Sequence, residues 1–175
     1  MRALKILLVV IVILLAATGA AIEMGLYNVA ADHPHWRVTR QLLTQVRERS
    51  IEVRSQNLTV PDLSAPQLVA TGAGHYAEMC TGCHLAPGMD SSELREGLYP
   101  KPPVLYKTGI DDPREAFWII KHGIKMTAMP AWGKSHSDQA IWAIVAFLKK
   151  LPSMTPAQYQ AITAKSQTKD GDGQD

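Results

Sequence analysis

The sequence predicts an all-α fold with one N-terminal helix able to cross a membrane. Three observations support this prediction. A strongly apolar, uncharged run occupies residues 6–22, helix start and stop signals recur along residues 64–156, and no alternating run of useful length predicts a strand. At 175 residues the chain has room for one modest domain beside the apolar segment.

The N-terminal segment has the layout of an export signal. Arg2 and Lys5 precede the apolar run, and the small residues AATGAA end it. The run lies between the ~7–15 residues of a signal-peptide core and the roughly 20 of a spanning helix, so cleavage after Ala20 or Ala21 is an alternative. We expect residues 1–31 to be an uncleaved anchor in a bacterial cytoplasmic membrane, with the rest of the chain in the periplasm.

Residues 32–63 predict an amphipathic helix followed by a linker. Asp32 and Pro34 suit its start, and SQNLTVPDLSAP reads as the linker. Four apolar residues recur near one face of this helix: Val38, Leu42, Val46 and Val53. That face either meets a membrane partner or the membrane surface, or it folds back onto the following domain.

Residues 64–156 predict a compact helical domain, and residues 157–175 a disordered tail. Proline at a first helical position and glycine just past a last one mark the boundaries. The three expected helices run from Ala65 or Pro66 to Cys80, from Asp111 or Asp112 to Gly123, and from Ser135 or Ser137 to Pro152. Three short helices and two long loops make a poor core, so we expect another group to fill the middle.

The charge distribution argues against nucleic acid as a partner. The net charge is +2, and no run of lysine and arginine occurs. Between Gly97 and His136, six basic residues stand against three acidic ones. They form either a docking surface for an acidic protein or ordinary solvated charges.

Both cysteines of the chain lie in the pentapeptide CTGCH, Cys80 to His84. This is the pattern for covalent attachment of a c-type haem, in which two thiols add to the porphyrin vinyl groups and the histidine binds iron. A thioredoxin-like motif would need a preceding strand, a zinc site more ligands, and a disulfide here would be strained. We therefore expect one haem c, attached through Cys80 and Cys83, with His84 as an iron ligand and no catalytic residue.

The second axial ligand decides what such an iron does. An open position would bind gas or peroxide, whereas a methionine or second histidine would favour electron transfer. Met79 and Met89 lie too close to His84 in sequence to reach the opposite haem face easily. Met126 and Met129 lie on a glycine-bounded loop that is long enough, although a lone methionine is more often core filler.

CTGCH together with GIKMTAMPAWG resembles class I cytochrome c, especially bacterial single-haem domains similar to the cytochrome subunits of haem-copper oxidases and alcohol dehydrogenases. The resemblance implies the class I fold wrapped around one haem, with Met129 as the distal ligand and Met126 as the runner-up. KPPVL resembles the family's Pro-x-Leu, which implies that the carbonyl of Pro103 accepts a hydrogen bond from His84 and that Leu105 packs on the haem.

The same resemblance implies contacts between the first and last helices of the domain. Ile144 and Phe147 are expected to meet Gly72 and Tyr76, because the small glycine lets the two helices cross closely.

These features together predict a one-electron carrier and no enzyme. Iron with histidine and methionine ligands would cycle between Fe(III) and Fe(II). The expected partners are redox proteins, with a respiratory or dehydrogenase donor and an acceptor at the outer face of the membrane. Two alternatives are a fixed haem relay subunit of a larger membrane oxidoreductase complex and a haem enzyme or gas sensor.

Overall fold

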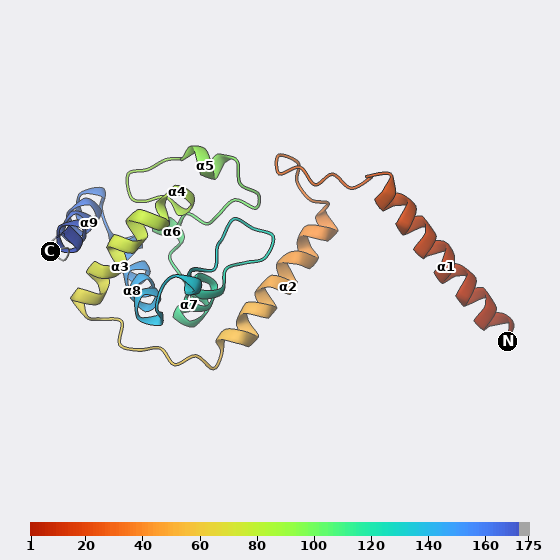
Figure 1. Cartoon of the computed structure of the whole chain (residues 1–175), viewed down its shortest axis with the longest axis horizontal. Helices are drawn as coiled ribbons and strands as arrows, with labels where there is room; N and C mark the ends of the chain where they lie inside the picture. The colour runs from red at the N-terminus through yellow and green to blue at the C-terminus, as the bar shows by residue number, and fades with distance from the viewer. Residues whose placement is uncertain (172–175) are drawn as a thin grey trace. The chain divides into compact units, whose positions relative to one another are not determined.

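The computed structural model describes residues 1–171, with side chains as far as Ala164. The chain divides into two compact units, Met1–Pro34 and His35–Asp175 (Figure 1). Within the described residues every regular element is a helix, which confirms the predicted all-α class.

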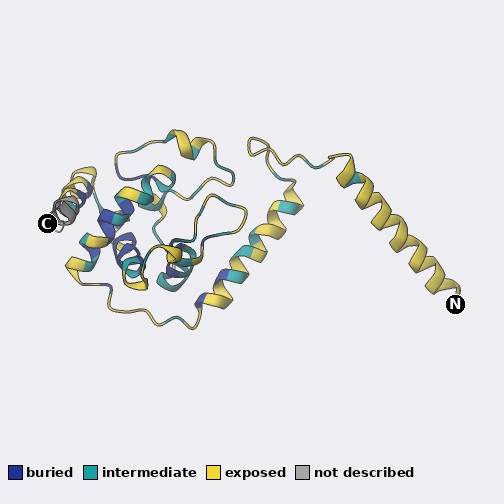
Figure 2. Ribbon diagram, viewed as in Figure 1, coloured by how far each residue is buried: buried dark blue, intermediate teal, exposed yellow. Residues whose placement is uncertain are grey.

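The first unit contains α1, Arg2–Glu23, which covers the predicted apolar run. None of its residues is buried within the protein (Figure 2). At 22 residues it extends over about 33 Å, which matches the ~30 Å hydrocarbon core of a bilayer. In the part of the chain that the structure describes, it is the one helix with the length and composition of a membrane span.

The second unit contains the other helices and two short 3-10 turns. Five of the helices described in this unit have ten or more residues, and they follow one another along the chain as α2, α3, α7, α8 and α9. In chain order the bounds are α2 (Arg37–Ser55), α3 (Pro66–Met79), α4 (Thr81–His84), α5 (Glu93–Glu96), α6 (Leu105–Thr108), α7 (Pro113–His122), η1 (Trp132–Lys134), α8 (Asp138–Lys150), η2 (Leu151–Ser153) and α9 (Pro156–Gly171).

The core of this unit is the crossing of α3 and α8, where the buried residues gather (Figure 2). At Gly72 the two backbones come so close that an added Cβ would lie 1.9 Å from the carbonyl oxygen of Ala143. One turn further on, the rings of Tyr76 and Phe147 pack with their centroids 5.3 Å apart. The predicted meeting of these two helices is therefore present.

Local signals set the ends of α7 and α8 where the sequence predicted them. The Asp112 carboxylate accepts a hydrogen bond from the backbone N–H of Arg114 at 2.8 Å, and the Ser137 hydroxyl accepts one from Ala140 at 3.3 Å. Between the two helices, Phe117 stacks on Trp142 at 4.1 Å. This stacked pair extends the core to α7.

Helix α2 begins at Arg37, later than the predicted start at Asp32 or Pro34. The backbone before it is held elsewhere, since the N–H of His35 donates to the Tyr99 hydroxyl at 3.1 Å. At its other end, Ile51 and Ser55 are buried and the Arg114 guanidinium donates to the carbonyl of Gln56 at 3.3 Å. Helix α2 thus packs on α7, but not through the predicted apolar face.

The prediction of a disordered tail over residues 157–175 is wrong for its first part, because α9 continues the domain. Tyr159 and Thr163 are buried, and the Tyr159 ring lies 6.3 Å from that of Phe147. With Ile162 they form a short apolar face at helical spacing, which the surrounding polar residues obscure in the sequence. Residues 172–175 of the predicted tail lie outside the described residues.

Candidate haem-attachment site

The CTGCH motif forms a single helical turn directly after α3. Cys80 ends α3, and its carbonyl accepts hydrogen bonds from the N–H of Cys83 at 3.1 Å and of His84 at 2.8 Å. Residues three and four apart lie on the same side of a helix, so the two thiols and the imidazole project from one face. Both cysteines are half-buried and have free thiols, and burial raises the pKa of Cys80 to about 12.

His84 is oriented by a hydrogen bond from Nδ1 to the carbonyl oxygen of Pro103, 2.9 Å away. Burial lowers the pKa of His84; the Pro103 hydrogen bond opposes this shift, and the Arg95 charge adds to it. Because a carbonyl only accepts, Nδ1 carries the proton and the lone pair of Nε2 is left for a metal. The contact that the family resemblance implies for Pro103 is present in the structure.

A buried tyrosine braces the backbone next to His84. The Tyr76 hydroxyl donates to the carbonyl of Leu85 at 2.6 Å, and burial raises the pKa of Tyr76. Leu85 ends the CTGCH turn with φ of 60°, a conformation that a leucine rarely adopts. The bond from α3 therefore holds a strained residue in the position that turns the chain away from His84. From the sequence, Tyr76 is expected only to pack between two helices, and nothing local predicts this hydrogen bond.

Arg95 is a second supporting residue, and the sequence does not single it out. Its Nη1 donates to the carbonyl of Cys83 at 3.1 Å and also to the carbonyl of Pro102. These carbonyls immediately precede His84 and Pro103, so one guanidinium joins the two chain segments that the imidazole hydrogen bond also joins. No local pattern marks this arginine, because its partners lie 12 and 7 residues away.

The loop that carries Met129 is closed on itself. The Ile124 N–H donates to the carbonyl of Met129 at 3.2 Å, while the Thr127 hydroxyl donates to Ile124 at 2.9 Å and accepts from the Met129 N–H at 3.1 Å. Gly123 has φ of 66°, and a Cβ there would lie 2.7 Å from the carbonyl oxygen of Met129. Only glycine therefore lets the end of α7 pass so close to this loop.

The methionines differ in where they lie. Met129 is half-buried and packs against the core, whereas Met126 is 92% exposed and has φ of 58°. Met79 and Met89 are also half-buried against the core. Exposure thus separates the two methionines of the loop and favours Met129 as the one that faces inward.

The residues present fit a covalently held haem. Two thiols and a neutral imidazole share one face of a turn, and the half-buried Leu105 and Met129 lie at the edge of the same apolar core. Trp132 and Ile110 are also only half-buried by the polypeptide. These apolar side chains would gain burial against a porphyrin ring, as the small predicted core requires.

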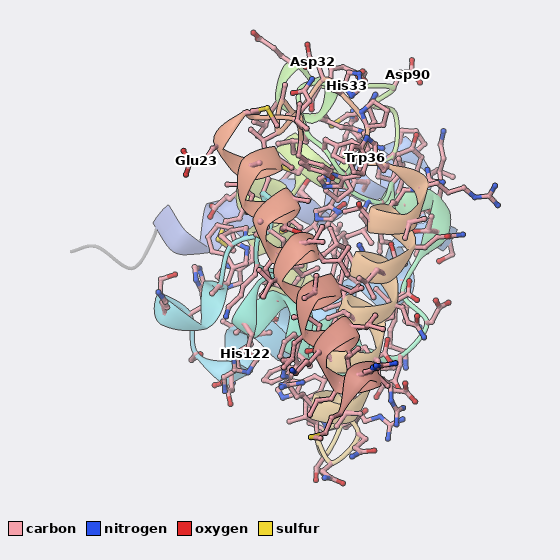
Figure 3. The ribbon with its side chains drawn as sticks, turned by 90° about the vertical axis from the view of Figure 1, so that its right-hand side faces the viewer. Glu23, Asp32, His33, Trp36, Asp90 and His122 are labelled. Carbon is pink, nitrogen blue, oxygen red and sulfur yellow. The ribbon has the colours of Figure 1, made fainter. Side chains whose placement is uncertain are left out.

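Among the described residues, no three histidine, cysteine or acidic side chains group as a metal ion would require. Of the other histidines, His75 and His136 meet edge to face at 5.6 Å, and His122 lies on the surface at the end of α7 (Figure 3), 4.9 Å from the Trp118 ring.

Half of the six basic residues between Gly97 and His136 form ion pairs within the domain. The pairs are Lys101 with Glu96, Arg114 with Asp112, and Lys121 with Asp138. This pairing favours ordinary solvated charges for these three residues over a docking surface.

Comparison with known protein families gives a match over the helical domain. Residues 67–148 match the family model described as cytochrome c oxidase, cbb3-type, subunit III. No curated protein and no solved structure matches the chain. The match spans α3 to α8 and includes the CTGCH turn and the Met129 loop. The match supports a class I c-type cytochrome domain within residues 67–148 and, in general terms, haem-mediated electron transfer, and the apolar N-terminal helix fits membrane anchoring.

Proposed function

We propose that the protein is a membrane-anchored one-electron carrier with a single haem c, attached through Cys80 and Cys83 and ligated by His84 and Met129. The observation that carries this proposal is the orientation of His84. Its Nδ1–H donates to the Pro103 carbonyl, so the neutral imidazole presents Nε2 as a ligand on the same face as both thiols. When bound, a haem with these ligands supplies a single electron that is taken up and released at iron.

The residues around His84 and Met129 serve this role by holding the two ligand-bearing segments in a fixed conformation. Tyr76 and Arg95 fix the backbone on both sides of His84, and three hydrogen bonds close the loop of Met129. Rigid supports on both ligand-bearing segments minimise the rearrangement between oxidation states. They also disfavour loss of Met129, which would open a position for gas or peroxide.

The membrane segment sets where the carrier acts. We infer that α1 holds the protein in the cytoplasmic membrane, with its haem domain in the periplasm, because Arg2 and Lys5 precede the apolar run. A carrier in this position receives electrons from a quinol-oxidising complex or a dehydrogenase and passes them to an acceptor at the outer face. Its partners are redox proteins.

Optical spectra of the purified full-length protein test this function. We expect the ferrous protein to show sharp low-spin bands and to bind carbon monoxide only slowly, because both axial positions are filled. Rapid carbon monoxide binding by the ferrous protein would instead establish an open iron site and contradict the carrier assignment.

A fixed relay subunit of a larger complex is the second candidate. The family model that matches residues 67–148 describes a subunit of an oxidase, and this favours the possibility. Solubilisation of membranes in a mild detergent, followed by size separation with haem detection, distinguishes the two. A free carrier migrates alone, whereas a relay subunit migrates with a complex of fixed composition.

A further inference from the structure

An ordinary amphipathic helix packs its apolar face on the protein, but the main apolar face of α2 is exposed and points away from the domain. The buried residues of α2 are Ile51 and Ser55, which lie on the side that packs against α7. Four apolar residues project from the other side and are 75, 59, 59 and 40% exposed: Val38, Leu42, Val46 and Val53, here called the outer face. At 3.6 residues per turn, the centre of the outer face lies about 170° around the helix from the centre of the buried pair.

Packing of α2 on the domain does not account for the apolar residues of the outer face. The helix is already attached to the domain through Ile51, Ser55 and the hydrogen bond from Arg114 to Gln56. A row of large aliphatic side chains along four turns is an exposed apolar surface of the kind that marks an interaction site. Polar residues at these positions would hold the helix on α7 equally well.

We propose that the outer face of α2 lies flat on the lipid surface of the membrane that α1 spans. The first argument is the covalent tether. Only residues 24–36 separate the last residue of α1 from the first of α2, a reach of at most about 45 Å even when fully extended. Such a tether gives the outer face a high effective concentration at the bilayer, so that a weak interfacial helix is sufficient for binding.

The second argument is charge. Helix α2 contains five arginines and two glutamates, an excess of positive charge that suits anionic headgroups. Arg49 lies within the outer face, between Val38 and Leu42 around the helix, and pairs with Glu52 at 2.8 Å. Its aliphatic stem can lie along the apolar surface while its guanidinium exchanges this exposed pair for the headgroups. The other four arginines of α2 lie more than about 110° around the helix from the centre of the outer face, so Arg49 is the arginine placed to contact headgroups directly and the others add only to the net positive charge.

The third argument is geometry. The 19 residues of α2 form a rod of about 28 Å, and the domain packs on the side away from the outer face. With the outer face on lipid, the haem domain stands on the water side of α2 and its position relative to the membrane is fixed. Trp36, labelled in Figure 3, marks the end of α2 that the tether reaches.

Spin labels on the full-length holoprotein in vesicles of phosphatidylcholine and phosphatidylglycerol test this proposal. Single cysteines are introduced by Leu42→Cys and Val46→Cys on the outer face, and by Gln41→Cys as the matched control on the neighbouring exposed side. We expect labels at positions 42 and 46 to become accessible to oxygen and to lose accessibility to a water-soluble nickel chelate. The label at position 41 should stay accessible to nickel.

Two results would overturn the proposal. Equal nickel accessibility at positions 41, 42 and 46 would show an outer face in water. Exclusion of both reagents at 42 and 46 would show that protein covers the face, and spin–spin broadening would then identify a second copy of this chain.

A charge variant keeps the test independent of any one label. In a Val53→Cys protein, the label should be more accessible to oxygen than to the nickel chelate. The double substitution L42E/V46E should abolish this preference for oxygen, whereas Q41E/Q45E should retain it. Retention of the preference in L42E/V46E contradicts the proposal. An unchanged haem spectrum in each variant shows that the domain is folded.

The proposal depends on the proposed function only through its test. The spin-label experiment requires that the introduced cysteine is the only free thiol, which holds when Cys80 and Cys83 are bound to haem. Labelling of the unsubstituted protein would reveal free thiols there and would count against the haem assignment rather than against the outer face.

Discussion

His84 is held by contacts from three directions. Its own Nδ1 donates to Pro103, Tyr76 fixes the carbonyl of the next residue, and Arg95 fixes the carbonyl of the preceding one. Each contact restricts a different part of the same short segment. The orientation of the imidazole is therefore a property of the surrounding fold.

At this scale the sequence points to the residues proposed to hold the haem, whereas it does not reveal the residues that support them. The motif CTGCH places Cys80, Cys83 and His84 within five consecutive residues. Their spacing of three and four residues alone predicts that they share one face of a helical turn. Arg95 joins carbonyls that come together only when the loop between His84 and Pro103 folds back, so no local pattern could reveal it.

Replacement of Arg95 by glutamine is expected to destabilise the holoprotein by about 1–3 kcal/mol, because two carbonyls lose a charged donor. Loss of a positive charge close to His84 should also lower the reduction potential, since it favours the oxidised iron. Denaturant unfolding and a redox titration measure the two effects.

Lys101→Gln is the matched control, as it removes the same charge from an exposed ion pair with Glu96. Its effect on stability should stay below about 1 kcal/mol. Equal effects of the two substitutions on stability and potential would show that Arg95 acts only as a surface charge.

The helix crossing is the principal contact between elements. Because a Cβ at Gly72 would lie 1.9 Å from the Ala143 carbonyl oxygen, Gly72→Ala must push α3 and α8 apart. We expect a loss of about 3 kcal/mol in the free energy of unfolding, measured by denaturant titration of the holoprotein. Gly97→Ala, whose Cβ would meet nothing closer than 3.8 Å, should change it by less than about 0.5 kcal/mol. Similar values for the two variants would contradict the close crossing.

Helix α9 adds an element beyond the segment that matches the family model. Tyr159→Ala should remove a buried ring and cost about 2–4 kcal/mol of stability, whereas the exposed Gln160→Ala should cost less than about 0.5 kcal/mol. Calorimetry of the holoprotein compares them. An unchanged stability of the Tyr159→Ala protein would mean that α9 does not pack on the domain.

The elements that the sequence predicted well are those with local signals. Pro113 with Asp112, and Ser137, specify the starts of α7 and α8 through contacts within three residues. The start of α2 was misplaced because a long-range hydrogen bond from His35 to Tyr99 holds the preceding backbone. Helix α9 was missed because its apolar face comprises few residues within a polar, charged sequence.

At the scale of the whole molecule, one chain combines a helix with the length and composition of a membrane span and a c-type cytochrome domain. We expect the intact mass of the purified protein to equal the 175 residues of the sequence plus one haem, because the proposed anchor keeps α1 and the sequence has one pair of cysteines. A mass that lacks the first 20 or 21 residues would show a cleaved signal instead of an anchor.

The placement of the domain has its own test. Protease added to the outside of spheroplasts is expected to digest the haem domain, because the proposed orientation places this domain on the outer side of the cytoplasmic membrane. Protection of the domain until the membrane is disrupted would reverse the assigned orientation. A cytoplasmic marker protein that stays intact serves as the control for lysis.

The central claim is that Met129 closes the iron site opposite His84. The weak near-infrared absorption of the ferric protein reports methionine–iron coordination and tests this claim most directly. We expect Met129→Ala to lose this band and Met126→Ala, at a 92% exposed position, to keep it. A Met129→Ala protein that retains the band while Met126→Ala loses it would contradict the account.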